Sequence, residues 1–396
     1  MYGYAPLNSD FDNFYVRRLK LRINDCFNRP VTGVPGRKIT LLERETKDYC
    51  KTFQLTGKTR DCLNLSSYNY LGFAQSEGPC ADAVEQTVRK YGISSCSSRI
   101  EVGTLDLHLQ VESLIARFVG KPAAMVVSMG YATNSTTFPA LASKGCLIIS
   151  DELNHSSIVF GSRLSGAFIR VFKHNSMEDL ENLLKECISQ GQPRTHRPWK
   201  KILLVVEGLY SMEGSICNLP KIIELKRKYK TIDALRLWNH ASVYAESMTP
   251  PILQQIYTSM SIIMGEDDAK SGEGKIRLER LAFNARYLST NLRRMGFIIY
   301  GDTDSPIIPL LLFNPAKIPA FSRECLKRNI AVVVVAYPAT PMISSRARFC
   351  ISAAHTKQDL DEILKSCNEI GEILQLKLSS KVQRKSIEEV LKINDI

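Results

Sequence analysis

The sequence predicts an α/β protein in which a doubly wound, mostly parallel sheet forms the larger domain and a smaller α+β domain follows it. Between residues 123 and 229, short apolar runs alternate with amphipathic segments, as in successive strands and crossover helices. After residue 260, helical patterns are interspersed with apolar runs and turns, which favours antiparallel strands. Because open α/β sheets bind ligands at the carboxyl ends of their strands, the loops at those ends are the first place to look for a site.

The segment from Met129 to Ser157 organises the predicted larger domain. A glycine turn at Gly130 begins a helical segment, and a second apolar run leads into a polar loop that carries His155. Backbone N–H groups at Gly130 and Tyr131 could bind a phosphate, while the imidazole lies over an aromatic ring. An ordinary strand–helix–strand unit with a solvated histidine explains the same pattern, since one glycine turn is a weak phosphate signal.

The remaining elements follow from periodicity and turn residues. Helical patterns occupy residues 11–27, 78–91, 105–118, 157–164, 177–188, 219–229, 231–244, 250–262, 275–295 and 316–328. Apolar runs typical of strands occupy residues 123–128, 145–150, 168–172, 201–207, 297–300, 307–313, 332–336 and 349–352, and short strands and turns fill 39–65. We expect an N-terminal helix and strand segment (1–60), a large domain (61–260), a small domain (261–380) and a tail (381–396).

Composition limits the classes of function. The 396 residues can bury a substantial core, and 44% hydrophobic with 23% charged residues is ordinary for a globular protein. The net charge of +12 admits an anionic partner, but the basic residues are dispersed. Because no zinc-ligand spacing or RNA-binding signature accompanies them, we expect neither a metal site nor a nucleic-acid partner.

The eleven cysteines contain no CxxC pair, and no N-terminal segment has the pattern of a signal peptide, so we expect reduced thiols facing the cytosol. No apolar run approaches the roughly 20 residues that span a bilayer. We therefore expect any membrane attachment to come from a partner or from an interfacial surface.

Several motifs together resemble one known family. They are GYATN, SDELNHSS, VEGLYSMEGS, PATP and RARFCISAAHT, joined by SSYNYLGF and GQPRTHRPWKKILLVVEG. Together they resemble the 2-oxoamine synthases, enzymes that use pyridoxal 5'-phosphate (PLP) to condense an amino acid with an acyl-CoA. Within that family the chain is most similar to the catalytic subunits of eukaryotic serine palmitoyltransferases. The resemblance implies the PLP-dependent transferase fold, fold type I.

The resemblance also implies roles for individual residues. Gly130 and Tyr131 correspond to the phosphate site, His155 to the residue that stacks on the cofactor ring, and Ser211 to a polar contact of that ring. In the substrate site, the corresponding residues are Tyr68, Asn69 and Arg348, and the arginine matches the one that holds the amino-acid carboxylate. From pattern alone, the segment with Tyr68 and Asn69 could instead be a strand end where tyrosines cap a core. Arg348 could instead be an exposed arginine at a strand edge.

The chain departs from the family pattern after the helix that ends at residue 229. There the family has a strand ending in Asp-Glu-Ala-His and a later strand leading to Thr-Phe-Thr-Lys, whereas this chain runs from KRKYK directly into TIDALRLWNHASVY. By that comparison about fifty residues are missing near Lys230 and Thr231, about one and a half βαβ units. The missing Asp pairs with the pyridine nitrogen and the missing Lys forms the Schiff base, so no catalytic residue of this kind is present.

The resemblance implies condensation of L-serine with palmitoyl-CoA, with loss of CO₂, to give 3-ketosphinganine. It further implies a heterodimer with the non-catalytic subunit at the cytosolic face of the endoplasmic reticulum membrane. Because of the gap, a non-catalytic variant from a splice form or an imperfect gene model, acting at most as an assembly or regulatory partner, is the alternative. A basic anion-binding protein outside the family is supported only by surface charge.

Overall fold

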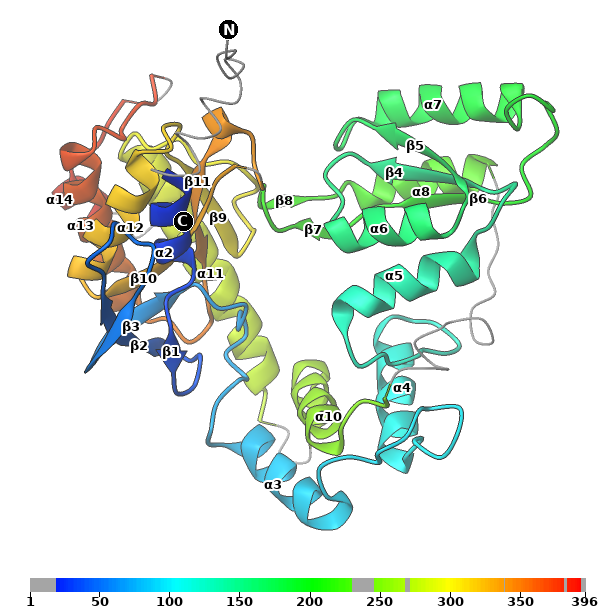
Figure 1. Cartoon of the computed structure of the whole chain (residues 1–396), viewed down its shortest axis with the longest axis horizontal. Coiled ribbons are helices and arrows are strands. Elements are labelled where there is room, and N and C mark those ends of the chain that lie inside the picture. The colour runs from blue at the N-terminus through cyan, green and yellow to red at the C-terminus, as the bar shows by residue number, and fades with distance from the viewer. Residues whose placement is uncertain (1–18, 230–245, 268–270, 338, 381–382, 393–396) are drawn as a thin grey trace, which may run out of the picture. The chain divides into compact units, whose positions relative to one another are not determined.

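The computed structural model describes residues 19–229, 246–267, 271–337, 339–380 and 383–392, which form two compact units (Figure 1). Unit 1 comprises residues 1–76, 211–215 and 274–396, and unit 2 comprises residues 77–210 and 216–273. This division differs from the predicted domain boundaries because the strands before residue 76 pair with strands after residue 330. The N-terminal and C-terminal segments therefore build one sheet.

The sheet of unit 2 has β4 (Leu147–Asp151) at its centre. β5 (Phe168–Phe172) and β6 (Ile202–Val205) pair with β4 on its two sides, and both run parallel to it. Every residue of β4 is buried. Burial on both faces explains why this strand reads in the sequence as a continuous apolar run rather than as an alternating one.

Helices cover both faces of this sheet, with α7 (Met177–Gln190) on one side and α5 (Gly130–Leu141) and α6 (Ser156–Leu164) on the other (Figure 1). Successive side chains of β4 point to opposite faces. Leu147 and Ile149 therefore pack with apolar residues of α7 and α8 (Leu219–Tyr229), while Ile148 packs with residues of α5 and α6. The predicted doubly wound arrangement is present in these layers.

The rest of unit 2 is mostly helical. α3 (Pro79–Tyr91) and α4 (Asp106–Phe118) both pack against α10 (Pro250–Met264), and the buried residues Leu107, Val111 and Leu253 form a core between α4 and α10. β7 (Leu209–Tyr210) and β8 (Ser215–Ile216) pair as a short two-stranded sheet.

Unit 1 contains a six-stranded mixed sheet in the order β1-β2-β3-β10-β11-β9. Only β3 and β10 pair in parallel; the other neighbours are antiparallel. The strands are β1 (Val31–Thr32), β2 (Lys38–Glu45), β3 (Gln54–Leu65), β9 (Ile307–Leu311), β10 (Ile330–Val335) and β11 (Arg346–Cys350).

The helices of unit 1 bury one face of this sheet in a large apolar core. They are α2 (Leu21–Phe27), α11 (Glu273–Arg294), α12 (Lys317–Lys327), α13 (Lys357–Ile373) and α14 (Ile387–Lys392), with a 3₁₀ turn at Met342–Ser344. On β11, Ala347 and Phe349 join this core, so alternation along the strand places Arg346 and Arg348 on the opposite face.

Most predicted elements are confirmed within a few residues, but two predicted strands are wrong. Residues 123–128 form no strand, and the run at 297–300 contributes a single bridge between Ile299 and Leu310. A strand needs a neighbour for its backbone groups, and no strand among the described residues pairs with 123–128. The first part of the predicted helix at 11–27 and the segment at 231–244 lie outside the described residues.

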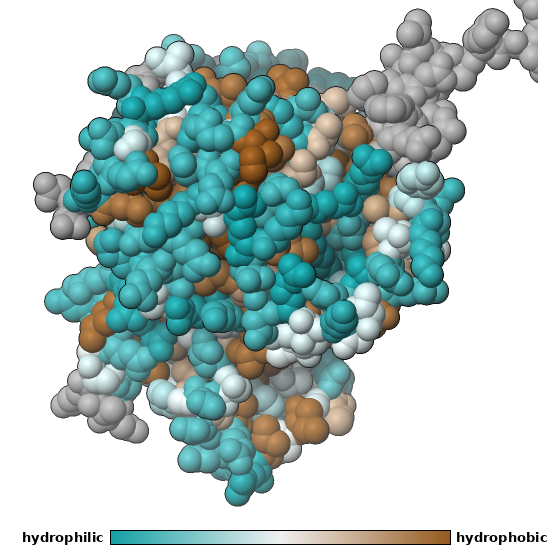
Figure 2. Space-filling view, turned by 90° about the vertical axis from the view of Figure 1, so that its left-hand side faces the viewer, coloured by the Kyte–Doolittle hydropathy of each residue, from teal (hydrophilic) through white to brown (hydrophobic). Residues whose placement is uncertain are grey.

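The surface and the thiols add two observations. The face shown in Figure 2 is mostly hydrophilic, with apolar side chains in small separate patches. All eleven cysteines are free and only Cys96 is exposed. Among the helices that the structure describes, none has the length and apolar content required to cross a membrane.

The outer edge of β6 generates a prediction about folding. Among the described strands, β6 pairs only with β4, so its other edge is unpaired. β6 is also the last strand of this sheet before the missing segment, which in the family supplies further strands. Several hundred Å² of uncovered apolar surface, at roughly 25 cal/mol per Å², would lower the free energy of unfolding by several kcal/mol, and unpaired backbone groups add to this. That loss is comparable with the net stability of a domain. We expect the chain alone to be poorly soluble or partly unfolded, with amides of residues 201–206 exchanging much faster than those of β4. Cooperative thermal unfolding together with strong protection of 201–206 would contradict this.

Candidate functional site

The first group of predicted site residues lies at the carboxyl end of β4 in unit 2. α6 begins just after β4 ends, and the crossover helix α5 packs closely against α6. Gly161 of α6 lies so near α5 that an added Cβ would stand 2.6 Å from the carbonyl oxygen of Asn134. The close packing of the two helices fixes their N-terminal residues, which are the predicted cofactor contacts.

The N-terminus of α5 has the features of an anion site. Gly130 is its first residue, and Met129, the preceding cap residue, makes no side-chain capping bond. The Thr133 N–H donates to the Met129 carbonyl at 2.9 Å, so the N–H groups of residues 130–132 precede the first backbone bond of the helix. Such groups, with the helix dipole behind them, favour a phosphate.

His155 is the cap residue of α6, and its ring is oriented by its neighbours. Nδ1 accepts a hydrogen bond from the Ser157 N–H at 3.2 Å and lies 2.7 Å from the Ser157 hydroxyl. The backbone N–H of His155 donates to the carboxylate of Glu207, just after β6. The exposed imidazole meets the ring of Tyr131 edge-on, with centroids 6.3 Å apart. The structure therefore brings Gly130, Tyr131 and His155 together.

The loop that carries His155 is held by buried polar side chains that the sequence interpretation did not single out. Asn154 donates through Nδ2 to the Ser150 hydroxyl and to the Val205 carbonyl, both at 2.9 Å. Asp151, only 3% exposed, accepts the Leu153 N–H at 2.9 Å and has each carboxylate oxygen 3.0 Å from Nδ1 of His174.

Tyr210 completes this buried cluster. Its ring meets that of His174 edge-on at 4.4 Å, and burial, aided by the nearby Asp151 carboxylate, raises the pKa of its hydroxyl. The cluster ties the ends of β4 and β5 to β7. A possible sequence signal was the position of Asp151 and His174, since each follows an apolar run at its carboxyl end, where ligand-proximal polar residues gather.

The second group of predicted residues lies in unit 1, around Arg348. This residue is 3% exposed and lies in β11, which has β10 on one side and β9 on the other. Nη2 donates to the Tyr68 hydroxyl at 2.7 Å, and the guanidinium carbon lies 5.2 Å from the centre of the Tyr68 ring. Nη1 contacts the Ser211 carbonyl at 3.5 Å. The alternative of an exposed arginine at a strand edge is therefore wrong.

Arg348 has unused binding capacity. Its Nε is buried and has no hydrogen-bond partner, and no carboxylate among the described residues forms an ion pair with it. Burial raises the pKa of both Tyr70 and Cys350 nearby, so these groups stay neutral at physiological pH. A buried cation without an anion is costly, and a guanidinium binds a carboxylate through two parallel hydrogen bonds. The geometry fits an anionic ligand.

Arg346, two residues earlier on the same face, is an arginine of this strand whose buried donors have hydrogen-bond partners. It is also 3% exposed, but its Nε donates to the Ser344 carbonyl at 2.9 Å and its Nη1 to the Met212 carbonyl at 2.8 Å. The carboxylate of Glu213 lies 3.5 Å from Nη1. Arg346 thus anchors the segment that carries Ser211, whereas Arg348 does not have a comparable anion.

Two other predicted residues are placed less simply. The side-chain amide of Asn69 donates to the carbonyls of Pro35 and Ala74 at 3.0 and 3.4 Å, and its oxygen accepts the Ala74 N–H at 3.2 Å. It therefore stabilises its own loop, and contact with a substrate stays a prediction. Ser211 contacts Arg348 through its carbonyl, so a role for its hydroxyl toward a cofactor also stays a prediction.

Comparisons with known proteins agree with these features. The family model for aminotransferase class I and II matches residues 60–234 and 231–366. Serine palmitoyltransferase 2 of Schizosaccharomyces pombe is 54% identical over 96% of this chain and 72% of its own length, and serine palmitoyltransferase 2 of Saccharomyces cerevisiae is 49% identical over 98% and 80%. This chain belongs to the serine palmitoyltransferase family.

The solved structures show the same fold. A serine palmitoyltransferase from S. paucimobilis with a bound PLP–myriocin aldimine matches with a TM-score of 0.74 and 24% identity, over 94% of this chain and all of that chain. The predicted PLP-dependent transferase fold is therefore confirmed.

The relatives also support the predicted gap. The match to the S. pombe serine palmitoyltransferase extends over 433 residues, whereas 96% of this 396-residue chain is about 380 residues. About fifty aligned positions thus have no counterpart here. The family model matches in two pieces that meet at residues 231–234, where the sequence interpretation placed the gap.

The contrast between the two buried arginines generates a stability prediction. Arg348→Met removes a buried cation that lacks an anion, so we expect the free energy of unfolding to stay unchanged or to rise by up to about 2 kcal/mol. Arg346→Met removes the donors to two half-buried carbonyls and the ion pair with Glu213, so we expect a loss of about 2 kcal/mol. Denaturant unfolding of unit 1, followed by amide exchange in β11, measures both. A loss from Arg348→Met equal to that from Arg346→Met would show that Arg348 is a structural residue.

Proposed function

We propose that this chain is, by descent, the catalytic-type subunit of serine C-palmitoyltransferase. That enzyme joins L-serine to palmitoyl-CoA with loss of CO₂ to give 3-ketosphinganine, the first step of sphingolipid synthesis, with PLP as cofactor. The observation that carries the proposal is the buried guanidinium of Arg348, which has an unpartnered Nε and no carboxylate partner among the described residues. The similarity to serine palmitoyltransferases and the PLP bound in matching solved structures support it.

The described residues fit the demands of PLP chemistry in part. When bound, PLP supplies an electron sink for the carbanion that forms at the amino-acid α-carbon. In unit 2, the N–H groups at Gly130 and Tyr131 would hold its phosphate, and the His155 ring, fixed by Ser157 and Glu207, would lie against its ring. The polar contact with the cofactor ring predicted for Ser211, which belongs to unit 1, stays a prediction.

Substrate binding would depend on Arg348 and Tyr68 of unit 1. The guanidinium would bind the serine carboxylate in a two-point fork, using the Nε that now has no partner. The Tyr68 hydroxyl, 2.7 Å from Nη2, would steady the guanidinium from its other side. The amide of Asn69 bonds to Pro35 and Ala74, and its predicted contact with the substrate stays a prediction.

We propose further that the chain as given is inactive. The amine that holds the PLP aldehyde is normally a lysine with a lowered pKa, and the pyridine nitrogen needs a carboxylate. In the family both groups belong to the segment that is missing near Lys230 and Thr231. The alternative is therefore a non-catalytic variant that acts at most in assembly or regulation, and the gap in the matches to relatives favours it for this exact chain.

Partner and location belong to the same proposal. We propose a heterodimer with the non-catalytic serine palmitoyltransferase subunit, at the cytosolic face of the endoplasmic reticulum membrane. Direct sequencing of the transcript across the Lys230–Thr231 codons would separate a biological gap from an imperfect gene model.

Restoring the missing segment tests the proposed reaction. The homologous segment of the S. pombe relative would be inserted between Lys230 and Thr231, and the chain would be co-expressed with the partner subunit. We expect serine-dependent formation of 3-ketosphinganine from palmitoyl-CoA by the restored chain and none by the chain as given. An insertion of equal length made of glycine and serine is the control.

Each outcome decides a separate part of the proposal. Activity of the chain as given, at the level of the restored chain, would contradict its proposed inactivity. A folded but inactive restored chain would contradict the proposed reaction.

A further inference from the structure

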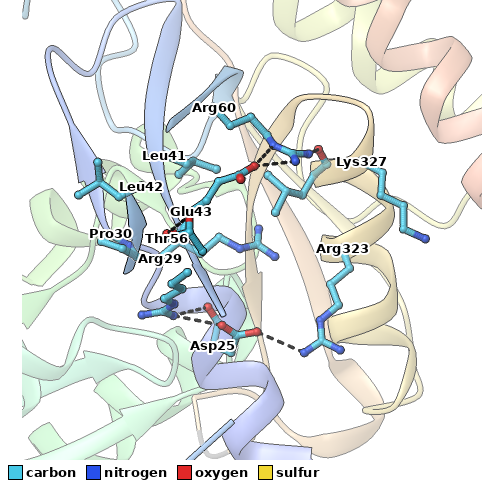
Figure 3. Close-up of a pocket in the computed structure, with 12 residues that line it drawn as sticks. Asp25, Arg29, Pro30, Leu41, Leu42, Glu43, Thr56, Arg60, Arg323 and Lys327 are labelled. Carbon is cyan, nitrogen blue, oxygen red and sulfur yellow. Dashed lines mark hydrogen bonds and ion pairs between the residues drawn. The ribbon is translucent and has the colours of Figure 1, made fainter. Parts of the chain in front are cut away.

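A basic pocket in unit 1 is formed by elements that the serine palmitoyltransferase reaction does not use. It has a cavity volume of about 430 Å³, within the range of small-molecule sites (Figure 3). Its walls come from the end of α2 and the following link, from β2 and β3, and from α12. The lining residues are Asp25, Arg29, Pro30, Leu41, Leu42, Glu43, Arg44, Thr56, Arg60, Arg323, Leu326 and Lys327.

Positive charge predominates in this pocket. Five of its side chains are cationic and two are carboxylates. Lys327 also pairs with Glu324, outside the lining, at 2.6 Å. With that third carboxylate counted, two positive charges remain in excess, which is unusual for a concave surface that concentrates the field of its walls.

Most of the cations have partners. Asp25 binds both Arg44 and Arg323, each at 3.2 Å. Glu43 binds Arg60 at 2.6 Å, and Figure 3 shows this pair and the pair of Asp25 with Arg323. Arg44 also lies over the ring of Phe53, 4.1 Å from its centre. One carboxylate is thus shared between two guanidinium groups, so part of their donor capacity is unused.

Arg29 differs from the others because no described residue forms a hydrogen bond or ion pair with it. It is half-buried. Burial raises the pKa of the Cys26 and Cys62 thiols, and nearby arginine charges oppose this rise. At Cys26 the largest opposing effect comes from Arg29. At Cys62 it comes from Arg60, with Arg29 second. The Arg29 charge is therefore felt inside unit 1 and not only at its surface. A half-buried guanidinium without an anion is the feature that points to a ligand.

The apolar lining residues limit what that ligand can be. Pro30, Leu42 and Leu326 border the cationic groups, and Leu41 is 6% exposed. A doubly charged anionic group would bind the cationic residues, and an adjoining carbon skeleton would contact the apolar ones. A phosphate monoester carries between one and a half and two negative charges at neutral pH, which matches the excess of two.

We propose that this pocket binds a phosphate group, with Arg29 and Arg323 as its main ligands and Lys327 at the rim. Guanidinium groups bind phosphate through paired N–H donors, whereas the lysine acts as a point charge. The phosphate can belong to a lipid headgroup or to a soluble compound, because the recognised chemistry is the same.

Hydrogen–deuterium exchange of the full chain tests this proposal, since it reports each peptide separately. The probes are inorganic phosphate, with chloride at matched ionic strength as the reference, and phosphatidylcholine vesicles with and without phosphatidic acid. We expect phosphate or phosphatidic acid to slow exchange in residues 38–45 and 317–328.

Arg29→Gln is the decisive variant, because it breaks no ion pair among the described residues. We expect it to weaken the protecting interaction about tenfold, as loss of one charge-assisted contact would do. Arg280→Gln, an exposed arginine of α11, removes the same charge outside the pocket and is the control. Without a probe, both variants should exchange like the unmodified chain.

The outcomes distinguish the sources of the phosphate. Protection by inorganic phosphate identifies a soluble phosphate ligand, and protection only by vesicles with phosphatidic acid identifies a lipid headgroup. The proposal is overturned if neither probe protects the pocket, or if Arg29→Gln and Arg280→Gln weaken protection equally, since the effect would then be general surface charge.

Discussion

A buried guanidinium without a carboxylate partner is the interaction on which the candidate site depends. Alternation along β11 sends Ala347 and Phe349 into the core of unit 1 and leaves Arg346 and Arg348 on the other face. Arg346 uses its buried donors on two backbone carbonyls, whereas Arg348 has a tyrosine hydroxyl, a distant carbonyl and an orphaned Nε. Burying the Arg348 guanidinium without an anion costs free energy, which lowers the stability of the fold. A bound carboxylate would offset that cost, so the buried charge would favour carboxylate binding.

In unit 2 the predicted cofactor-binding residues are well supported by packing, but the Schiff-base lysine of the family is missing. The fully buried β4 and the close packing of α5 on α6 hold Gly130, Tyr131 and His155 together, and Asp151 with His174 fixes the loop between them. The contacts that position these three residues all lie within residues 129–207 of the described chain.

Much of this was predictable from the sequence. The buried β4 gave a continuous apolar run, and the amphipathic periods of α7, α11 and α12 identified those helices, because local pattern and tertiary burial agree there. The segment 123–128 has an equally good strand pattern but forms no strand, since a strand requires a partner that no local pattern can supply.

The site was predictable only in part for a similar reason. His155 and Gly130 stand at element boundaries that the sequence shows, but the burial of Arg348 depends on β9 and β10 flanking it, and its Nε finds no partner among the described residues. The cluster of Asp151, His174 and Tyr210 joins three segments through side-chain contacts, which spacing alone does not reveal. The basic pocket likewise combines α2 with α12, nearly three hundred residues later, as the pair Asp25–Arg323 shows.

The central claim is that this chain keeps groups that bind the cofactor and the substrate carboxylate but has no lysine placed to hold the PLP aldehyde. The most direct measurement is borohydride reduction of the purified chain with excess PLP, followed by peptide mass spectrometry, with the segment-restored chain as the control. We predict a single stoichiometric pyridoxyl-lysine in the restored chain and only scattered, substoichiometric labelling in the chain as given. One stoichiometric pyridoxyl-lysine in the chain as given would contradict the claim.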